Sequence, residues 1–374
     1  MKMTVANEST KKILSALFSR KMLSRKDIAQ ATGLSRAAVT YSVDELLRQG
    51  ILLEKGVSEA SPKGGPKPIN LCLNSEACLV ISILVRPGDP IVQIVDITGE
   101  VRCKYPFLKQ YYEDFSQMID ETVGLCRRAI EEFGYARFLG VGISVPGNIR
   151  NNEVVFSPYF DAKKLNLGKK FSQELGMDVF VERDVYNMAY GERWRGCAQK
   201  QTDFLCVWIS SGIGSAAIVD SKLINGAMGL AGEMGFMAVD KRAYRERPYT
   251  LDDFGYFEEI TSVRRLEEKY CAPFEQVIAL AERNAAIMQD LYAMCDTLAM
   301  GITNAILLLN PSVIIVSGRF RHAKAAIGAY FERQVHQLCP MPCDIRFSYL
   351  GEDAITLGGT YLVLNQRLGI EMKE

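Results

Sequence analysis

The chain has 374 residues, of which 48% are hydrophobic and 24% charged, a composition typical of a globular protein long enough for two or three domains. Its 44 Lys and Arg residues balance 44 Asp and Glu residues, which excludes a uniformly basic or acidic protein. The balance hides an asymmetry, because residues 1–74 hold 12 Lys and Arg against 6 Asp and Glu. The net charge is therefore +6 in this head and −6 in residues 75–374. A basic head is attracted to nucleic acid phosphates whatever their base sequence.

The sequence pattern predicts neither export nor a membrane span. The N-terminus is polar, and the apolar run Ala77–Val85 contains Ser82 and is far shorter than the roughly 20 residues of a spanning helix. The ten cysteines are scattered, and the one close pair, Cys339 and Cys343, has no cluster of further ligands nearby in sequence. We therefore expect a cytoplasmic protein with no membrane partner, no metal site and no cofactor.

Residues Ser24 to Gly50 are predicted to form two helices joined by a tight turn. Ser24 followed by Asp27 resembles a capping box, Gly33 ends the first helix, and Ser35 caps the second. In a helix-turn-helix, the second helix enters the major groove of DNA. An ordinary helical hairpin within a core has the same pattern, so this segment alone leaves both interpretations open.

The second helix has two predicted faces. Val39, Val43, Leu46 and Leu47 recur at helical spacing and are expected to face a core. The outer face is expected to contact DNA, and its candidates are Ser35, Arg36, Ala37, Thr40 and Tyr41.

The next segments complete a winged helix. Ile51–Val57 and Pro68–Asn74 are predicted strands, and the loop between them is rich in Ser, Gly, Pro and Lys. Lys63 and Lys67 in this loop suit contact with phosphate or approach to the minor groove, although a solvated hairpin tip has the same composition. The predicted DNA-binding domain therefore spans residues 1–74.

The rest of the chain alternates between strands and helices, which indicates an α/β protein. Three strands joined by turns are predicted up to Tyr105, followed by a helix at 112–133 and a strand at 138–147. The pattern restarts at Phe204 with two strands joined by SSGIG.

Several segments, in this order, resemble the ROK family of repressors, open reading frames and sugar kinases. They are a GGPKP wing, GVGISVPG, VFVERDVYNMAYGERWRG, SSGIGSAAIVDSKLINGAMGLAGEMG and LLNPSVIIVSG. The resemblance covers nearly the whole chain and is strongest to the winged-helix branch, such as the xylose and N-acetylglucosamine repressors. It implies an actin-like, duplicated ribonuclease-H fold in which two lobes enclose a sugar cleft, assembled as a homodimer or homotetramer. The small lobe is expected at residues 75–195 with a C-terminal helix returning at 355–374, and the large lobe, with the ligand cleft and oligomer surface, at 196–354.

The resemblance also implies that the phosphate-binding turns of the family's kinases are altered. Leu84 takes the place of their metal-holding aspartate, and Pro87 removes a backbone donor. The second turn, at 210–214, keeps two glycines, and a paired glycine near the C-terminus is reduced to Gly318 before Arg319. These changes predict a protein that does not bind ATP and has no catalytic residue.

The resemblance also implies sugar-binding positions, and these keep more of the family's residues than the phosphate-binding turns do. Asp184 stands where the kinases have their general base, although it would equally cap the helix that follows. Arg183 replaces a sugar-binding asparagine. Its guanidinium either binds an anionic sugar derivative or forms an ion pair with Asp184 or Glu182. Gly147 and Asn148 are expected to close the pocket.

Further sugar contacts are expected in the large lobe. Glu233 and Glu258 match the family's ligands, although the neighbouring Glu259 blurs the second match. Phe236 replaces a histidine that also binds zinc in the family, and its ring would either stack on a sugar or fill the space of the metal. The family's zinc cysteines correspond to other residues here, namely Tyr249, Leu251 and Tyr256. Zinc takes about four N, S or O ligands, so no zinc is expected.

These features predict a sugar-responsive transcriptional regulator, most simply a repressor of a carbohydrate uptake or catabolism operon. Its partners would be double-stranded, palindromic operator DNA and a sugar or an anionic sugar derivative. Two alternatives remain open. One is an active sugar kinase with a fused regulatory domain, and the other is a regulator whose ligand site has decayed and which a partner protein controls.

Overall fold

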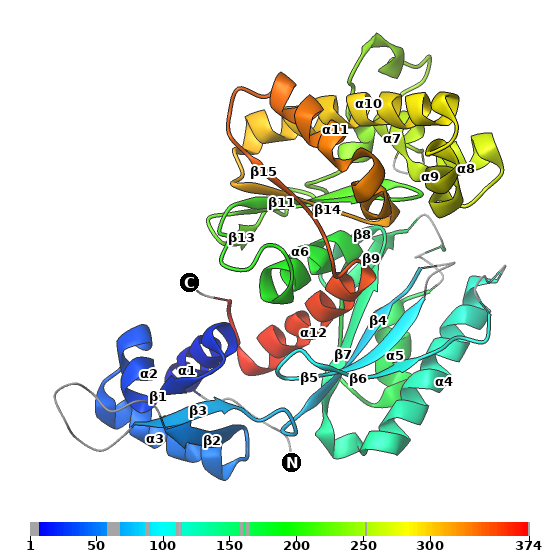
Figure 1. The fold of residues 1–374 in the computed structure, drawn as a ribbon. Helices are drawn as coiled ribbons and strands as arrows, with labels where there is room; N and C mark the ends of the chain where they lie inside the picture. Colours follow the sequence, from blue (N-terminus) through cyan, green and yellow to red (C-terminus); the bar gives the residue numbers. More distant parts are fainter. Residues whose placement is uncertain are drawn as a thin grey trace. The chain divides into compact units, whose positions relative to one another are not determined.

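The computed structural model describes residues 7–57, 68–86, 90–109, 112, 114–157, 160–161, 165–250 and 253–372. Its contacts divide the chain into two compact units (Figure 1). Unit 1 comprises Met1–Asn187 and Thr356–Glu374, and unit 2 comprises Met188–Ile355. The chain therefore passes between the units inside two helices, α6 (Asp184–Arg195) and α12 (Glu352–Leu368). The division into a DNA-binding domain and two lobes with the boundaries given above stays a prediction.

The N-terminal part of unit 1 is a winged helix. Its elements are α1 (Glu8–Arg20), β1 (Leu23–Ser24), α2 (Arg25–Thr32), α3 (Arg36–Arg48), β2 (Leu52–Val57) and β3 (Ile69–Leu73). The antiparallel sheet has the order β1-β3-β2, and the helices pack beside it (Figure 1). The predicted helix pair and both predicted strands are confirmed. The helix α1 and the two-residue strand β1 were not expected.

The winged helix has its own apolar core. Val39 and Val43 of α3 are fully buried, as is Ile28 of α2, against the apolar side of α1. The predicted inner face of α3 is therefore correct, except that Leu47 is only partly buried.

The rest of unit 1 is built on a five-stranded sheet with the order β6-β5-β4-β7-β10. The strands of this sheet are β4 (Leu79–Leu84), β5 (Ile91–Asp96), β6 (Val101–Tyr105), β7 (Phe138–Val145) and β10 (Val179–Arg183). The connecting elements are α4 (Phe115–Phe133), a 3-10 turn (Tyr135–Arg137), the hairpin of β8 (Asn148–Arg150) and β9 (Glu153–Phe156), and α5 (Leu167–Leu175). The strands β4, β5 and β6 are antiparallel neighbours, whereas β7 and β10 run parallel to β4. Their apolar residues bury a core on which α4 and α5 pack.

The C-terminal helix α12 belongs to this unit from Thr356 onward. The Ser82 hydroxyl of β4 donates a hydrogen bond of 2.6 Å to the carbonyl oxygen of Thr356. Farther along, the Tyr361 ring lies 6.0 Å from that of Phe18 in α1, and the main-chain N–H of Glu371 donates to Ser15 at 2.9 Å. The C-terminal segment thus contacts both the five-stranded sheet and the winged helix.

Unit 2 repeats the same topology in a sheet with the order β13-β12-β11-β14-β15. Its strands are β11 (Phe204–Ile209), β12 (Ile213–Val219), β13 (Lys222–Leu223), β14 (Val313–Ser317) and β15 (Asp344–Phe347), and its helices are η2 (Met234–Phe236), η3 (Lys241–Ala243), α7 (Tyr256–Thr261), α8 (Val263–Tyr270), α9 (Phe274–Ala281), α10 (Ala285–Leu309), η4 (Arg319–Ala323) and α11 (Lys324–Leu338). The first three strands are again antiparallel and the last two parallel to the first. The predicted fold, a winged helix followed by a duplicated α/β body, is therefore confirmed.

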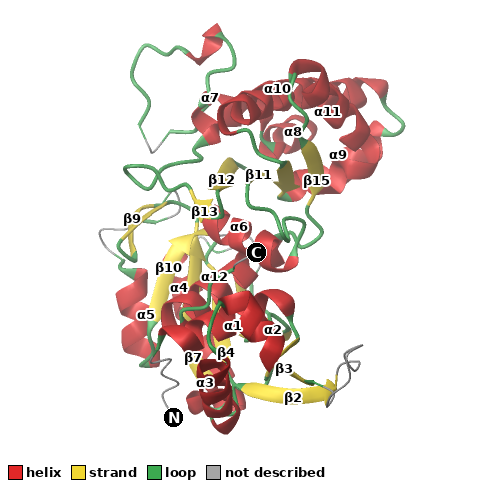
Figure 2. Ribbon diagram, turned by 90° about the vertical axis from the view of Figure 1, so that its left-hand side faces the viewer, coloured by secondary structure: helices red, strands yellow, loops and turns green. Residues whose placement is uncertain are grey.

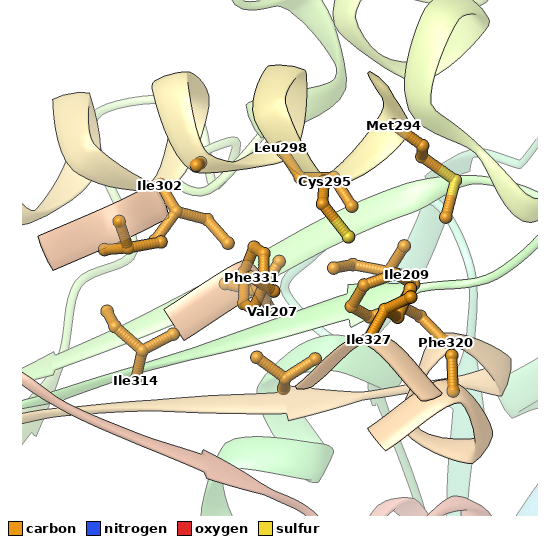
Figure 3. Close-up of a cluster of buried hydrophobic side chains, with 14 of the residues drawn as sticks. Val207, Ile209, Met294, Cys295, Leu298, Ile302, Ile314, Phe320, Ile327 and Phe331 are labelled. Carbon is orange, nitrogen blue, oxygen red and sulfur yellow. The ribbon is translucent and has the colours of Figure 1, made fainter. Parts of the chain in front are cut away.

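The core of unit 2 lies between its sheet and α10 with α11 (Figure 3). Met294, Cys295, Leu298 and Ile302 of α10 face Val207 of β11 and further apolar side chains of the sheet. Among the described helices, α10 is the one whose length and hydropathy match a membrane span, and 56% of its most apolar stretch is buried. This burial is that of a core helix. The length and composition of α10 are therefore only weak evidence for a membrane span.

Candidate functional sites

The helix pair of the winged helix is held by local caps. The main-chain N–H of Ser24 donates to the Asp27 carboxylate at 3.0 Å, and the N–H of Asp27 donates back to the Ser24 hydroxyl at 3.2 Å. The Ser24 hydroxyl also donates to this carboxylate and thereby lowers the pKa of Asp27 below its ordinary value. Gly33 follows in the left-handed conformation, with φ of 69°, which permits the sharp turn into α3. The predicted capping box is confirmed.

The helix α3 presents the predicted outer face to solvent. Ser35 caps it by accepting a hydrogen bond from the N–H of Ala38 at 3.2 Å. Arg36, Ala37 and Thr40 are exposed, and Tyr41 is 72% exposed. Within the described part of the chain, Arg36 and Tyr41 make no ion pair, hydrogen bond or ring contact through their side chains, which suits them to bind an external partner. Lys63 and Lys67 lie outside the described residues.

Arg25, in the helix that precedes α3, forms ion pairs within the winged helix. The guanidinium of Arg25 in α2 contacts Asp44 of α3 at 3.0 Å and Glu54 of β2 at 3.3 Å. This pair of contacts fixes α3 relative to α2 and to the first strand of the wing, so that the outer face has a defined orientation. Arg25 was not identified from the sequence, because its partners are 19 and 29 residues away.

In the body of unit 1, Asp184 begins α6 directly after β10. Its side chain is buried and forms an ion pair with the guanidinium of Arg86, which follows β4. One carboxylate oxygen also accepts the N–H of Val185 at 2.8 Å. The two strand ends lie close together because β4 and β10 are both parallel neighbours of β7. At the position that the resemblance assigns to a general base, the structure therefore has a salt bridge that the sequence did not reveal.

Arg183 has different partners from those expected. Its guanidinium lies 4.5 Å from the centre of the Tyr186 ring and donates to the Tyr186 hydroxyl at 3.0 Å, and the residue is 4% exposed. Its main-chain N–H donates to the Glu182 carboxylate at 2.8 Å, and burial raises the pKa of Glu182. The ion pair between Arg183 and Asp184 that the sequence suggested is replaced by the pair of Asp184 with Arg86.

Gly147 and Asn148 form a tight corner after β7. Gly147 has φ of 140°, and a Cβ atom there would lie 2.1 Å from the carbonyl oxygen of Phe156, so that only glycine fits. Asn148 is 6% exposed, and its Oδ1 atom has no hydrogen-bond partner among the described residues. A buried acceptor without a donor is costly, and a ligand hydroxyl would satisfy it.

Glu258 and Glu233 lie near each other in unit 2. The Glu258 carboxylate accepts a hydrogen bond of 2.6 Å from the N–H of Ile213, at the start of β12. Burial raises the pKa of Glu258 and the negative charge of Glu233 adds to this rise, whereas the Ile213 N–H opposes it. The neighbouring Glu259 instead contacts Arg245 at 2.6 Å on the outside. Of the two adjacent glutamates, Glu258 is the one directed at the β11–β12 turn.

The same turn is closed by a second network. The hydroxyl of Ser210 accepts a hydrogen bond of 3.1 Å from Nε of Arg319, and the guanidinium of Arg319 binds Glu267 in a bidentate pair at 2.5 and 2.8 Å. These contacts join the β11–β12 turn to the residue after Gly318. The equivalent first turn after β4 contains Pro87 and Gly88, which lie outside the described residues.

The positions that the resemblance assigns to zinc ligands hold other kinds of side chain. Phe236, Tyr249 and Tyr256 occupy three of the expected positions and offer no thiolate or imidazole, and Leu251 lies outside the described residues. Among the described residues, no group of three His, Cys, Asp or Glu side chains is arranged to hold a metal. His322 and His336 are exposed and belong to other segments. The residues present do not fit a zinc site.

The fold and these sites define a winged-helix DNA-binding protein fused to a sugar-kinase-like body. The sequence pattern of the winged helix-turn-helix DNA-binding family matches residues 7–52, and that of the ROK family matches residues 93–366. The chain belongs to the ROK family.

Its similar relatives include repressors over nearly the whole length. The xylose repressor of Bacillus subtilis (strain 168) is 24% identical over 379 residues, covering 97% of each chain. The DNA-binding transcriptional repressor Mlc of Escherichia coli (strain K12) is 24% identical over 66% of this chain and 61% of that protein.

Solved structures show the same fold. A ROK family transcriptional regulator described as a homologue of E. coli Mlc has a TM-score of 0.79 at 19% identity, with 96% of this chain and 97% of that chain covered. A ROK family glucokinase from Streptomyces griseus, in complex with glucose and AMPPNP, has a TM-score of 0.61 at 20% identity, with 76% and 98% covered. The kinase match covers a smaller share of this chain than the regulator match.

Proposed function

We propose that this protein is a sugar-responsive transcriptional repressor that binds operator DNA through α3. The observation that carries this proposal is the exposed outer face of α3 on a winged helix, joined to a sugar-kinase fold. The repressor names of relatives that span the whole chain support it. Genes of carbohydrate uptake or catabolism are the expected targets, and the cytoplasm the expected location.

The effector is proposed to be a sugar or a sugar derivative. The unpartnered Asn148 oxygen beside Gly147 supports a ligand contact in unit 1. Within unit 2, the neighbouring carboxylates Glu233 and Glu258 support sugar contacts of their own. Arg183 remains the candidate for an anionic group, but such a group would have to compete with Tyr186 for the guanidinium. Phe236 contacts Tyr249, which favours its role as a filler over stacking on a sugar.

Regulation would proceed by a shift in population. A sugar that binds one arrangement of the body more tightly than another favours that arrangement, and the recognition helices are then displaced from the operator. In a homodimer the two α3 helices are related by two-fold symmetry, so we propose a palindromic operator with half-sites about one helical turn apart.

We also propose that the body does not phosphorylate sugars. The salt bridge between Arg86 and Asp184 supports this, because the carboxylate at the base position is already paired with a cation. The bidentate pair of Arg319 with Glu267 at the second turn supports it as well. An ADP-release assay over a panel of sugars should stay at background. ADP release that Asp184→Asn abolishes would establish the kinase alternative instead.

The DNA-binding assignment is tested with full-length protein and the DNA upstream of its own gene, by fluorescence anisotropy. Arg36→Ala combined with Thr40→Ala should weaken binding by about tenfold or more, because each lost base contact costs roughly 1–3 kcal/mol. Arg48→Ala is the matched control, since Arg48 is an exposed arginine at the other end of α3, beside Glu45. The control should bind within about twofold of the wild type. Equal binding by the double variant and the wild type would overturn the role of this face.

A further inference from the structure

The loop between η2 and α7, residues 237–255, has a closed neck. A Cβ atom on Gly255 would lie 2.1 Å from the carbonyl oxygen of Gly235, so the two ends of the loop meet backbone to backbone. Glu233 directly precedes η2 on one side of this neck, and Glu258 lies in α7 on the other. The loop itself extends from the body of unit 2 (Figure 2). Contacts that hold the loop in place therefore also position Glu233 and Glu258, the two residues proposed to bind the sugar.

Aromatic contacts occupy the positions where the resemblance implies zinc ligands. The rings of Phe236 and Tyr249 meet at right angles, 5.8 Å apart, which is a favourable edge-to-face arrangement. The guanidinium of Arg245 lies 4.2 Å from the centre of the Tyr249 ring. The Tyr249 hydroxyl donates to the carbonyl oxygen of Ala243 at 3.1 Å. Tyr249 thus joins the residue before the loop, Phe236, to Ala243 and Arg245 within the loop.

Ion pairs fasten both arms of the loop. In the first arm, Asp240 accepts hydrogen bonds from the Tyr256 hydroxyl at 2.9 and 3.0 Å and contacts Arg242 at 2.6 Å. In the second arm, Asp253 forms a bidentate pair with Arg247 at 2.6 and 2.9 Å. The contact of Asp240 with Tyr256 ties the first arm directly to α7.

We propose that these aromatic and ionic contacts hold the loop without a metal, and that Tyr249 and Phe236 are positioning residues for Glu233 and Glu258. The proposal rests on the proposed sugar site. A metal would hold the loop through bonds to its ligands. Here the same segment is held by contacts between side chains, and the strength of the ionic contacts depends on salt concentration and pH.

The acid dependence has a definite sign. The hydrogen bond from Arg242, assisted by Tyr256, holds the pKa of Asp240 well below its ordinary value, and Arg247, with Thr250, does the same for Asp253. A second guanidinium, that of Arg245, lies 3.9 Å from Asp253. A carboxylate whose pKa is lowered by folding stabilises the fold above its ordinary pKa of about 4, and this contribution is lost as the pH falls below it. The loop should therefore be insensitive to pH between about 5 and 8 and loosen below about 4.

The test measures hydrogen–deuterium exchange of the peptides covering 233–258, which include Glu233 and Glu258, in full-length protein, together with zinc content after purification without added metal. Wild-type protein should contain no stoichiometric zinc, and its exchange should be unchanged by EDTA or by added zinc chloride. Tyr249→Ala should accelerate exchange in the loop by about tenfold, because local opening governs the rate.

Two variants serve as controls. Tyr249→Phe keeps the ring contacts and should exchange within about twofold of the wild type. Tyr244→Ala removes a tyrosine of the same loop that is 89% exposed, and it should likewise leave the rate unchanged. Unchanged exchange in unit 1 peptides shows that each variant is folded. Stoichiometric zinc, loosening by EDTA, or a Tyr249→Ala loop as protected as the wild type would each overturn the proposal. Because neither DNA nor sugar is present, the outcome is independent of the repressor assignment.

Discussion

Arg86 and Asp184 show how a single contact changes the chemistry available to this body. Both side chains are buried, with 9% and 8% exposure, and their opposite charges are paired. Removing a charge from water costs several kcal/mol, which the partner compensates. We propose that an aspartate paired in this way serves structure, because a carboxylate held by a cation is poorly placed to accept a proton from a sugar hydroxyl.

The prediction at this scale concerns stability. Arg86→Ala should lower the free energy of unfolding by about 3–5 kcal/mol, because it leaves the Asp184 carboxylate buried without a counter-charge. Urea unfolding followed by circular dichroism measures this. The double variant Arg86→Ala with Asp184→Asn removes both charges. It should be less destabilising than the sum of Arg86→Ala alone and Asp184→Asn alone. Additive effects, within about 0.5 kcal/mol, would show that the two side chains are not coupled.

At the scale of elements, the strongest local signals were the most reliable. The caps at Ser24 and Ser35 and the turn at Gly33 depend on neighbours within three residues, and the structure confirms all of them. The strand β1 was missed because two residues become a strand only by pairing with β3.

The candidate sites also divide into features that lie within one element and contacts between residues far apart in the sequence. The exposed face of α3 followed from helical periodicity within one element. Arg86 was missed as the partner of Asp184, because the two residues are 98 positions apart and meet only when β4 and β10 flank β7. The choice of Glu258 over Glu259 likewise depends on the contact with Ile213, 45 positions away.

At the scale of the whole molecule, the division of charge shapes the encounter with DNA. The winged helix carries a net charge of +6 and the remaining residues −6, so attraction to phosphate is confined to the head. We therefore expect the long-range attraction between this protein and DNA to depend on the head.

This asymmetry predicts how binding depends on salt. Lys63→Ala combined with Lys67→Ala should reduce the slope of log affinity against log salt concentration by about 2, since each lost phosphate contact removes about one. Anisotropy titrations between about 50 and 200 mM salt measure the slope. Lys169→Ala with Lys222→Ala removes two exposed lysines from the body and should leave the slope unchanged. A slope that does not respond to the wing variant would remove Lys63 and Lys67 from the interface.

The amino-acid sequence by itself determined the winged helix, its basic charge, the exposed outer face of α3, and the membership in the ROK family. The winged helix, its charge and the outer face of α3 depend on periodicity, caps and composition, which act over a few residues or over whole segments. The family followed instead from the resemblance of several motifs in one order. Only the tertiary structure decided that Arg86 neutralises Asp184, that Glu258 is directed at the β11–β12 turn, and that aromatic and ionic contacts fasten the loop before α7. Such contacts join residues that are distant along the chain, and their partners are selected by the order of strands in each sheet and by the closure of a loop.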